Sequence, residues 1–298
     1  MMTRKTYILG GLFIVLLLVA YLVTQQPGEQ SAATDSAGNL VAIDSLAVDK
    51  IEITSPTSTV VLEKKGVEWY LQKPISYRAD QNNVASVIQE TKRMEIKSIV
   101  SSKPEKQSVF QVDSTGSLVK IYQQGVETAS FIIGKPGNSY SETYVRKSNS
   151  NDVILVGSSL SYIFTKPLKE WRDRLICKVP REKIQEVKYQ YGDTIFALTW
   201  KDSTWMIGKD STQSSVVEGV LSSLSEFQTD DFIDTAFTAP PKAAAQITVG
   251  STHLTFFQLK GQDKFFVRSS TSPQWFEVQS WRANQVLKRK KELVKTGA

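Results

Sequence analysis

The feature that constrains the fold most is an internal repeat, because the second half of the chain follows the residue pattern of the first. In each copy an apolar strand pattern leads, through a short polar turn, to a strand that carries a tryptophan, Trp69 in the first copy and Trp205 in the second. We match the opening strand at 49–53 to residues 182–185. The repeat predicts two modules of similar topology, over residues 45–177 and 178–298.

A helix is predicted after the tryptophan strand of each copy. Apolar residues recur at i, i+3, i+4, i+7 and i+10, which places their side chains on one buried face of a helix. The matched positions are Val84, Val87, Ile88, Thr91 and Met94 in the first copy, and Val217, Val220, Leu221, Leu224 and Phe227 in the second. Asn82 and Asn83 can cap the first helix, and Ser214 and Ser215 the second.

The rest of each copy is rich in strand patterns separated by turns. These patterns lie at 119–122, 131–133, 144–146 and 153–156 in the first copy, and at 246–249, 254–257, 266–268 and 275–278 in the second. Each copy closes with a helical stretch, at 160–175 and 281–294. The predicted fold class is therefore α+β, with an N-terminal transmembrane helix followed by two tandem repeats of an antiparallel-sheet-plus-helix module.

The transmembrane helix is predicted from an apolar stretch near the N-terminus. From Tyr7 to Val23 there are 17 residues without a charge, close to the length that spans a bilayer. Arg4 and Lys5 precede them, so the positive-inside rule places the N-terminus in the cytoplasm. We interpret residues 1–24 as a cytoplasmic tip and membrane anchor, and residues 25–44 as a flexible spacer. A signal peptide cleaved near 31–33 is the alternative.

The net charge of +6 does not predict nucleic-acid binding, because the basic excess lies at the two ends of the chain. A phosphate backbone requires a concentrated basic surface, and only residues 288–295 offer one. We expect no nucleic-acid partner and interpret this tail as the solvated end of the last helix. Binding of an anionic envelope polymer by the tail is the alternative.

Residues that could carry chemistry are few. The chain has one cysteine, Cys177, and one histidine, His253, so we expect no metal, no cofactor and no histidine-based catalysis. Ser117 and Lys120 match the S-x-x-K motif of penicillin-binding enzymes, but alternating apolar residues place them on a strand, and we interpret the match as chance. Three acids, Asp230, Asp231 and Asp234, could act on glycosidic bonds; we favour a solvated loop. Trp69 and Trp205 could stack on sugars, although their matched positions favour a role in the core.

The chain resembles the family of the domain of unknown function 4340. The resemblance rests on the strands that carry Trp69 and Trp205, the helices that follow them, and the segment Trp171-Arg172-Asp173-Arg174-Leu175. The chain departs from the family at 110–113, where members often have a Tyr-Gly-Leu turn. The resemblance implies a membrane-anchored bacterial protein that faces the periplasm or exterior, often encoded beside ABC transporter subunits, and it implies no catalytic residues.

From these observations we expect a non-catalytic extracytoplasmic accessory or scaffold protein of the bacterial cytoplasmic membrane. Its expected partners are the lipid bilayer, through the anchor that runs from Tyr7 to Val23, and the permease and ATPase subunits of an ABC-type transporter. Trp171, Arg172, Asp173 and Arg174 are the candidates for contacts with a partner or between the modules. The alternative is a cell-envelope hydrolase or glycan-binding protein.

Overall fold

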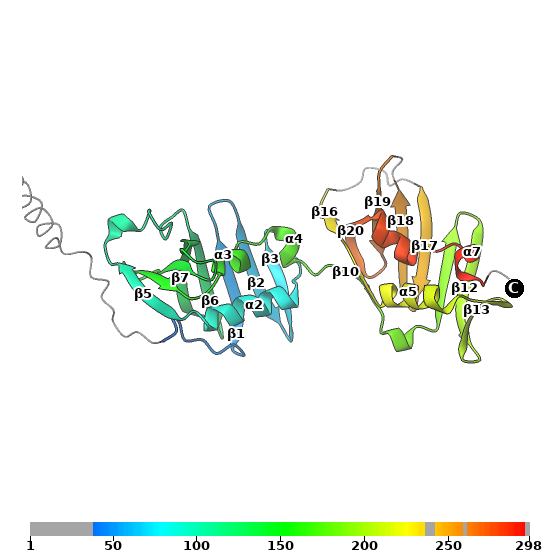
Figure 1. Cartoon of the computed structure of the whole chain (residues 1–298), viewed down its shortest axis with the longest axis horizontal. Coiled ribbons are helices and arrows are strands. Elements are labelled where there is room, and N and C mark those ends of the chain that lie inside the picture. The colour runs from blue at the N-terminus through cyan, green and yellow to red at the C-terminus, as the bar shows by residue number, and fades with distance from the viewer. Residues whose placement is uncertain (1–37, 236–241, 259–260, 296–298) are drawn as a thin grey trace, which may run out of the picture. The chain divides into compact units, whose positions relative to one another are not determined.

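The computed structural model describes residues 38–235, 242–258 and 261–295 (Figure 1). The chain divides in sequence into two compact units, between Trp171 and Arg172. This division lies six residues before the predicted boundary at 177. Residues 172–177 belong to the second unit because strand β10 (Leu175–Lys178) pairs there with β15 (Glu226–Gln228).

The first unit is built on one antiparallel sheet of nine strands, in the order β4-β3-β2-β1-β6-β7-β8-β9-β5. Its central strands alternate buried and more exposed residues, so every second side chain enters the core. The strands are β1 (Val48–Thr54), β2 (Thr59–Lys65), β3 (Glu68–Lys73), β4 (Tyr77–Arg78), β5 (Ile96–Ser101), β6 (Ser117–Gln123), β7 (Val126–Pro136), β8 (Thr143–Lys147) and β9 (Val153–Val156).

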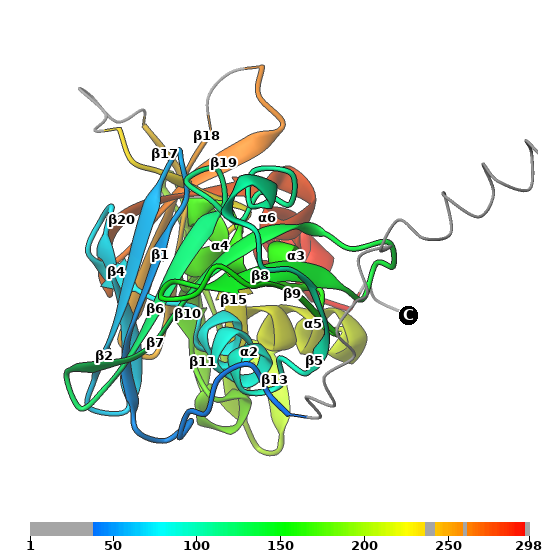
Figure 2. The same ribbon diagram turned by 90° about the vertical axis from the view of Figure 1, so that its left-hand side faces the viewer.

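Helix α2 (Gln81–Lys92) lies across one face of this sheet (Figures 1 and 2). It buries Val84, Val87, Ile88 and Thr91, as the helical spacing predicts. The residue that caps it is Asp80 and not the predicted Asn82 or Asn83, since the Asp80 side chain accepts a hydrogen bond from the amide of Asn83 at 2.8 Å. Two short helices, α3 (Leu160–Phe164) and α4 (Leu168–Trp171), complete the unit.

The second unit repeats this architecture. Its nine-stranded antiparallel sheet has the order β14-β13-β12-β11-β17-β18-β19-β20-β16, which is the strand order of the first sheet position by position. Helix α5 (Ser214–Ser225) takes the place of α2 and buries Val217, Val220, Leu221 and Leu224. The strands are β11 (Glu186–Tyr191), β12 (Thr194–Lys201), β13 (Thr204–Ile207), β14 (Asp210–Ser211), β16 (Asp231–Ile233), β17 (Ala243–Val249), β18 (Thr252–Gln258), β19 (Lys264–Ser269) and β20 (Ser272–Gln279).

The predicted α+β class is wrong, because 48% of the described residues are in strands and 20% in helices, so the chain is mostly β. The closing stretches predicted as long helices are short. At 160–175 the helix is interrupted near Pro167, which disfavours helical backbone at the preceding residue. At 281–294 it divides into α6 (Ser280–Val286) and α7 (Lys290–Leu293).

The opening strand of the second copy was matched three residues too early. Residues 181–183 form a 3₁₀ turn (Arg181–Lys183), and the strand equivalent to β1 is β11. Val187 pairs with Leu198 and Val249, as Ile51 pairs with Leu62 and Ile121. The local likeness of Glu182-Lys183 to Asp49-Lys50 carried no information about this register, which the pairing of buried residues determines.

The folded part of the first unit begins within the predicted spacer. Leu40 and Ile43 are buried in the core, with 1% and 9% of their surface exposed. Asn39 forms a β-bridge with Glu95. The predicted anchor from Tyr7 to Val23 lies outside the described residues. No helix within the described ranges combines the length and the apolar character needed to cross a membrane.

Candidate functional site

The predicted contact segment 171–174 contributes its side chains to the two units separately. Trp171 is fully buried in the first core; its Nε1 donates to the carbonyl of Lys166 at 3.1 Å, and its own carbonyl accepts from the amide of Asp80 at 2.9 Å. Arg174 donates from Nε and Nη2 to the carbonyl of Thr229 at 3.0 and 2.7 Å. These contacts place the segment in the internal structure of each unit, and a role in binding a partner stays a prediction.

Arg172 is the most buried cation of this segment, with 1% of its surface exposed. Its Nη1 lies 2.9 Å from Oδ1 of Asp234, and its guanidinium stacks on the ring of Phe232 at 3.7 Å. Asp173 acts locally, because its Oδ1 accepts from the amide of Leu175 at 3.0 Å. Arg172 therefore connects the start of the second unit to the end of β16.

The three acids considered for glycosidic chemistry do not share a site. Asp230 pairs with Arg282 at 3.0 Å and also accepts from the amide of Gln279 at 2.9 Å. Asp234 pairs with Arg172, and Asp231 accepts from the amide of Phe232 at 2.9 Å. Two of the three carboxylates thus form ion pairs, each with a different arginine. Within the described residues no group of His, Cys, Asp and Glu has an arrangement suited to a metal ion.

The remaining sequence candidates lie in structural positions. Ser117 is buried on β6, while Lys120 on the same strand forms an ion pair with Glu127 at 3.1 Å. Trp69 and Trp205 lie in the cores of their units. Burial raises the pKa of the Cys177 thiol to about 11, against a smaller opposing effect of a hydrogen bond with Thr252. His253 is exposed, and its Nδ1 lies 3.0 Å from Oγ1 of Thr248.

The basic tail packs more closely than a solvated helix end would. Leu293 is fully buried, and the guanidinium of Arg289 lies 3.7 Å from the ring centre of Tyr191. Lys290 forms an ion pair with Asp210 at 2.9 Å, and the amide of Lys295 donates to the carbonyl of Ser211 at 3.0 Å. The described part of the tail is therefore an integral edge of the second unit.

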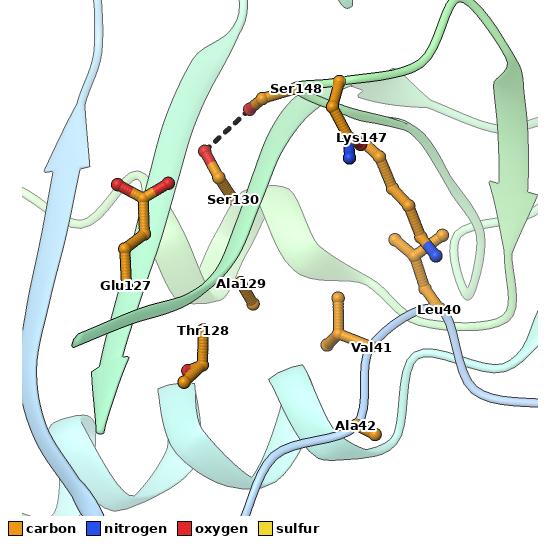
Figure 3. A pocket seen from close by; sticks show the side chains of 10 residues that line it. Leu40, Val41, Ala42, Glu127, Thr128, Ala129, Ser130, Lys147 and Ser148 are labelled. Carbon is orange, nitrogen blue, oxygen red and sulfur yellow. Dashed lines mark hydrogen bonds between the residues drawn. The ribbon is translucent and has the colours of Figure 1, made fainter. Parts of the chain in front are cut away.

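The first unit contains a hollow of about 520 Å³ that sequence reasoning did not find (Figure 3). Three separate segments line it: the chain at 40–42, the start of β7 at 127–130, and residues 147–149 at the end of β8. The hydroxyls of Ser130 and Ser148 lie 2.7 Å apart on one side, and Lys147, next to Ser148 in the chain, also lines the hollow (Figure 3). Leu40, Val41 and Ala42 form the apolar side opposite. Hydroxyls, an ammonium group and an apolar wall suit the binding of a small hydroxylated molecule.

One signal in the sequence could have indicated this hollow. The four apolar residues at 40–43 interrupt an otherwise polar segment, and an apolar run of this kind is expected to pack against a core. The partners at 127–130 and 147–149 carry no comparable pattern.

Comparison with known families gives one result. A family described as "Domain of unknown function (DUF4340)" matches residues 69–249 of the chain, from the tryptophan strand of the first unit to the end of β17 in the second. No curated protein and no solved structure matches the chain.

Proposed function

The chain belongs to the family of the domain of unknown function 4340, and from this premise we propose that it is a non-catalytic accessory or scaffold subunit of a membrane complex. The proposed complex is of the ABC-transporter type, with permease and ATPase subunits as partners. The proposed location is the outer surface of the bacterial cytoplasmic membrane, where the apolar stretch from Tyr7 to Val23 holds the protein.

The observation that supports the proposal is that polar side chains considered for chemistry or binding contact other side chains of their own unit. Asp230, Asp234 and Ser130 each contact another side chain of the fold, namely Arg282, Arg172 and Ser148. These contacts orient and stabilise strands and helices. Two sheets of the same strand order then supply a large folded surface, which is the contribution expected of a scaffold.

The charge pattern at the N-terminus supports the proposed location. Arg4 and Lys5 precede the 17 uncharged residues, and no lysine or arginine follows them before Lys50. This asymmetry favours a cytoplasmic N-terminus with both units on the other side of the membrane.

The test is a crosslinked pull-down of the full-length chain from native membranes, followed by mass spectrometry. Permease and ATPase subunits of a transporter should be enriched with the wild-type chain. The matched control carries Leu16→Arg and Leu17→Arg, which should prevent membrane insertion and abolish the enrichment. Recovery of the wild-type protein alone, at full yield, would contradict the proposal.

The hollow beside Ser130 and Ser148 favours glycan binding as a second candidate function. The test is calorimetric titration of the full-length protein with soluble peptidoglycan fragments, with Lys147→Ala as the variant. A saturable signal that Lys147→Ala weakens would support this function. Equal heats for the two proteins would contradict it.

A further inference from the structure

Three exposed apolar residues lie at one end of the first sheet. Leu46, Val67 and Val126 expose 86%, 89% and 65% of their surface. Leu46 is in the turn before β1, Val67 is in the turn between β2 and β3, and Val126 begins β7 after the turn from β6. Each apolar side chain therefore lies in a turn or directly beside one, and not at a strand centre.

The strand register brings these three turns to the same end. Val48, the first residue of β1, is paired with Gln123 at the end of β6. Lys50 is paired with Glu63, two residues before β2 ends. The three turns thus follow one another across neighbouring strands, at the lower end of the first unit in Figure 2.

Hydrogen bonds fix two of the turns to each other. The side chain of Gln123 donates to the carbonyl of Asp44 at 2.7 Å, and Asp49 accepts from the amide of Gly125 at 2.8 Å. The tip of the β6–β7 hairpin is therefore held against the turn that carries Leu46. Leu46 and Val126 are thus carried by two turns that are hydrogen-bonded to each other.

The fold does not require apolar residues at these tips, as the second unit demonstrates. Its β12–β13 turn has Asp202 and Ser203 where the first unit has Gly66 and Val67. Its β17–β18 turn consists of Gly250 and Ser251 alone, which join the paired residues Val249 and Thr252. The equivalent hairpin of the first unit extends further, by two residues on β6 and three on β7, as far as the pair Gln123 and Val126.

We propose that Leu46, Val67 and Val126 enter the interface of the lipid bilayer and fix the orientation of the first unit on the membrane. The inference rests on the proposed function, since it needs the segment from Tyr7 to Val23 to be inserted in the bilayer. Only 14 residues separate Val23 from Gly38, where the described chain begins, and a segment of that length spans at most about 50 Å. This reach keeps the first unit beside the bilayer.

The chemistry of the tips suits a lipid surface. Isolated aliphatic side chains on protruding turns can enter the headgroup region without exposing a strand edge to lipid. Lys65, exposed at the end of β2 beside Val67, can keep its ammonium group among the lipid phosphates while its methylene groups lie in the apolar layer. These three residues stand on separate turns, whereas a large continuous apolar patch is the usual sign of a protein-binding surface.

The test uses full-length protein in vesicles of phosphatidylethanolamine and phosphatidylglycerol. Val67→Cys is labelled with the environment-sensitive dye NBD; the native Cys177 is buried and has a raised pKa, so it should not take up label. The matched control is Tyr140→Cys, at a position 99% exposed in the turn after β7, at the opposite end of the sheet. The dye at 67 should show blue-shifted emission that lipids with a shallow doxyl group quench, and the dye at 140 should show neither effect.

A second pair of variants tests the other tips. Leu46→Asp together with Val126→Asp, added to the labelled Val67→Cys protein, should abolish the blue shift at 67. Ile195→Asp, an exposed apolar position of the second unit, should leave it unchanged. Circular dichroism confirms that each variant is folded.

The outcomes separate this proposal from the proposed function. If the protein resists alkaline extraction from the vesicles but the dye at 67 resembles the dye at 140, the membrane anchor stands and the contact of the tips is overturned. If alkaline extraction releases the protein from the vesicles and neither dye is in contact with lipid, both the membrane anchor and the contact of the tips are overturned. Quenching at 67 that survives the double substitution also overturns the role assigned to the three tips.

Discussion

Tyr189 and Tyr191 lie on the same face of β11 and differ in what their hydroxyl groups contact. The Tyr191 hydroxyl donates to the carbonyl of Lys288 at 2.9 Å. The Tyr189 hydroxyl is buried and has no hydrogen-bond partner among the described residues. Burial raises the pKa of both phenols above the ordinary value of 10. The second core therefore contains one phenol that makes a hydrogen bond and one that makes none within the described residues.

We expect Tyr189→Phe and Tyr191→Phe to change the free energy of unfolding in opposite directions. Tyr189→Phe removes a buried polar group that makes no hydrogen bond, so it should increase this free energy by about 1 kcal/mol. Tyr191→Phe removes a hydrogen bond and leaves the Lys288 carbonyl without it, which should lower the free energy by about 1 kcal/mol. Urea denaturation at pH 7 measures both, and a loss of stability in Tyr189→Phe would contradict the expectation.

The same two phenols predict a loss of stability at alkaline pH. In the unfolded chain they lose their protons near the ordinary pKa of 10, while in the native state their raised pKa keeps them protonated. Above pH 10 the unfolded state thus binds fewer protons, and stability falls with pH by up to about 1.4 kcal/mol per unit for each phenol. Urea denaturation at pH 8 and pH 10.5 should show a smaller decrease in Tyr189→Phe. Equal decreases in wild type and variant would contradict this.

Cys177 is expected to react slowly with alkylating reagents in the native protein. With a pKa of about 11, roughly one thiol in a thousand is ionised at pH 8, and the thiolate is the reactive form. In urea the thiol returns to its ordinary pKa of 9 and becomes accessible. Iodoacetamide labelling followed by mass spectrometry should show a large increase in rate on unfolding. Rapid labelling of the native protein would mean that the thiol is not buried as the structure has it.

At the residue scale, burial was more predictable than hydrogen bonding. The matched tryptophans Trp69 and Trp205 were favoured as core residues, and both lie in the cores. The cap of α2 was not found, because Asp80 precedes two asparagines that are equally suitable by type. Only the backbone conformation at Asp80 decides which side chain reaches the free amides.

The connection between β5 and β6 packs on strands β7 and β8 of the first sheet. Phe110 in this connection packs on Tyr144 at 4.5 Å, and Val112 is fully buried. The carbonyl of Val112 accepts from Nε of Arg146 at 2.8 Å. Gly134 on β7 lies beneath the connection, and a Cβ at this position would be 2.2 Å from the carbonyl oxygen of Phe110. The sheet can carry this connection only because residue 134 has no side chain.

We expect Gly134→Ala to destabilise the first unit and Gly219→Ala to stabilise the second. The methyl group at 134 must displace backbone, which should cost about 2 kcal/mol or more. Gly219 lies inside α5 with no atom within 4 Å of an added Cβ, so alanine should contribute up to about 1 kcal/mol through its higher helix propensity. Thermal and urea denaturation measure both variants, and a neutral Gly134→Ala would contradict the close packing of the connection.

At the element scale, helices α2 and α5 were predicted well at the first four matched positions of each, because those apolar residues follow the helical period closely. The fifth positions were wrong, since Met94 lies after the end of α2 and Phe227 lies in β15. The opening strand of the second unit was predicted poorly because a short strand has few residues with which to define its register. The packing of the β5–β6 connection, residues 102–116, could not be predicted, since its contacts with Gly134, Tyr144 and Arg146 join residues distant in sequence. Such contacts leave no local periodicity.

At the scale of the whole molecule, the repeat predicted two units but not the hollow in the first. The two strand orders agree because strands matched in sequence occupy matched places in the sheets. The hollow depends on 40–42 meeting 127–130 and 147–149, and no pattern in the sequence joins these segments. What a repeat specifies is topology, whereas the surface of each unit follows from turns and connections that the two copies do not share.

The composition of the two cores predicts that each unit unfolds with its own stability. The buried cluster of the first unit consists of residues between Leu40 and Trp171, and that of the second of residues between Ile176 and Leu293. Leu62 and Leu198 are equivalent, each fully buried on matched strands, β2 in the first unit and β12 in the second. Truncation of either to alanine should lower the stability of its own unit by about 2 to 5 kcal/mol.

Hydrogen exchange followed by mass spectrometry can assign the loss to a unit. In Leu62→Ala, peptides from β1 to β9 should lose protection while peptides from β11 to β20 keep it, and Leu198→Ala should give the reverse pattern. Loss of protection in both units from either substitution would mean that the chain unfolds as one cooperative body. In that case contacts beyond the two separate cores must couple them, and the division at Trp171 would describe the packing of the chain but not its energetics.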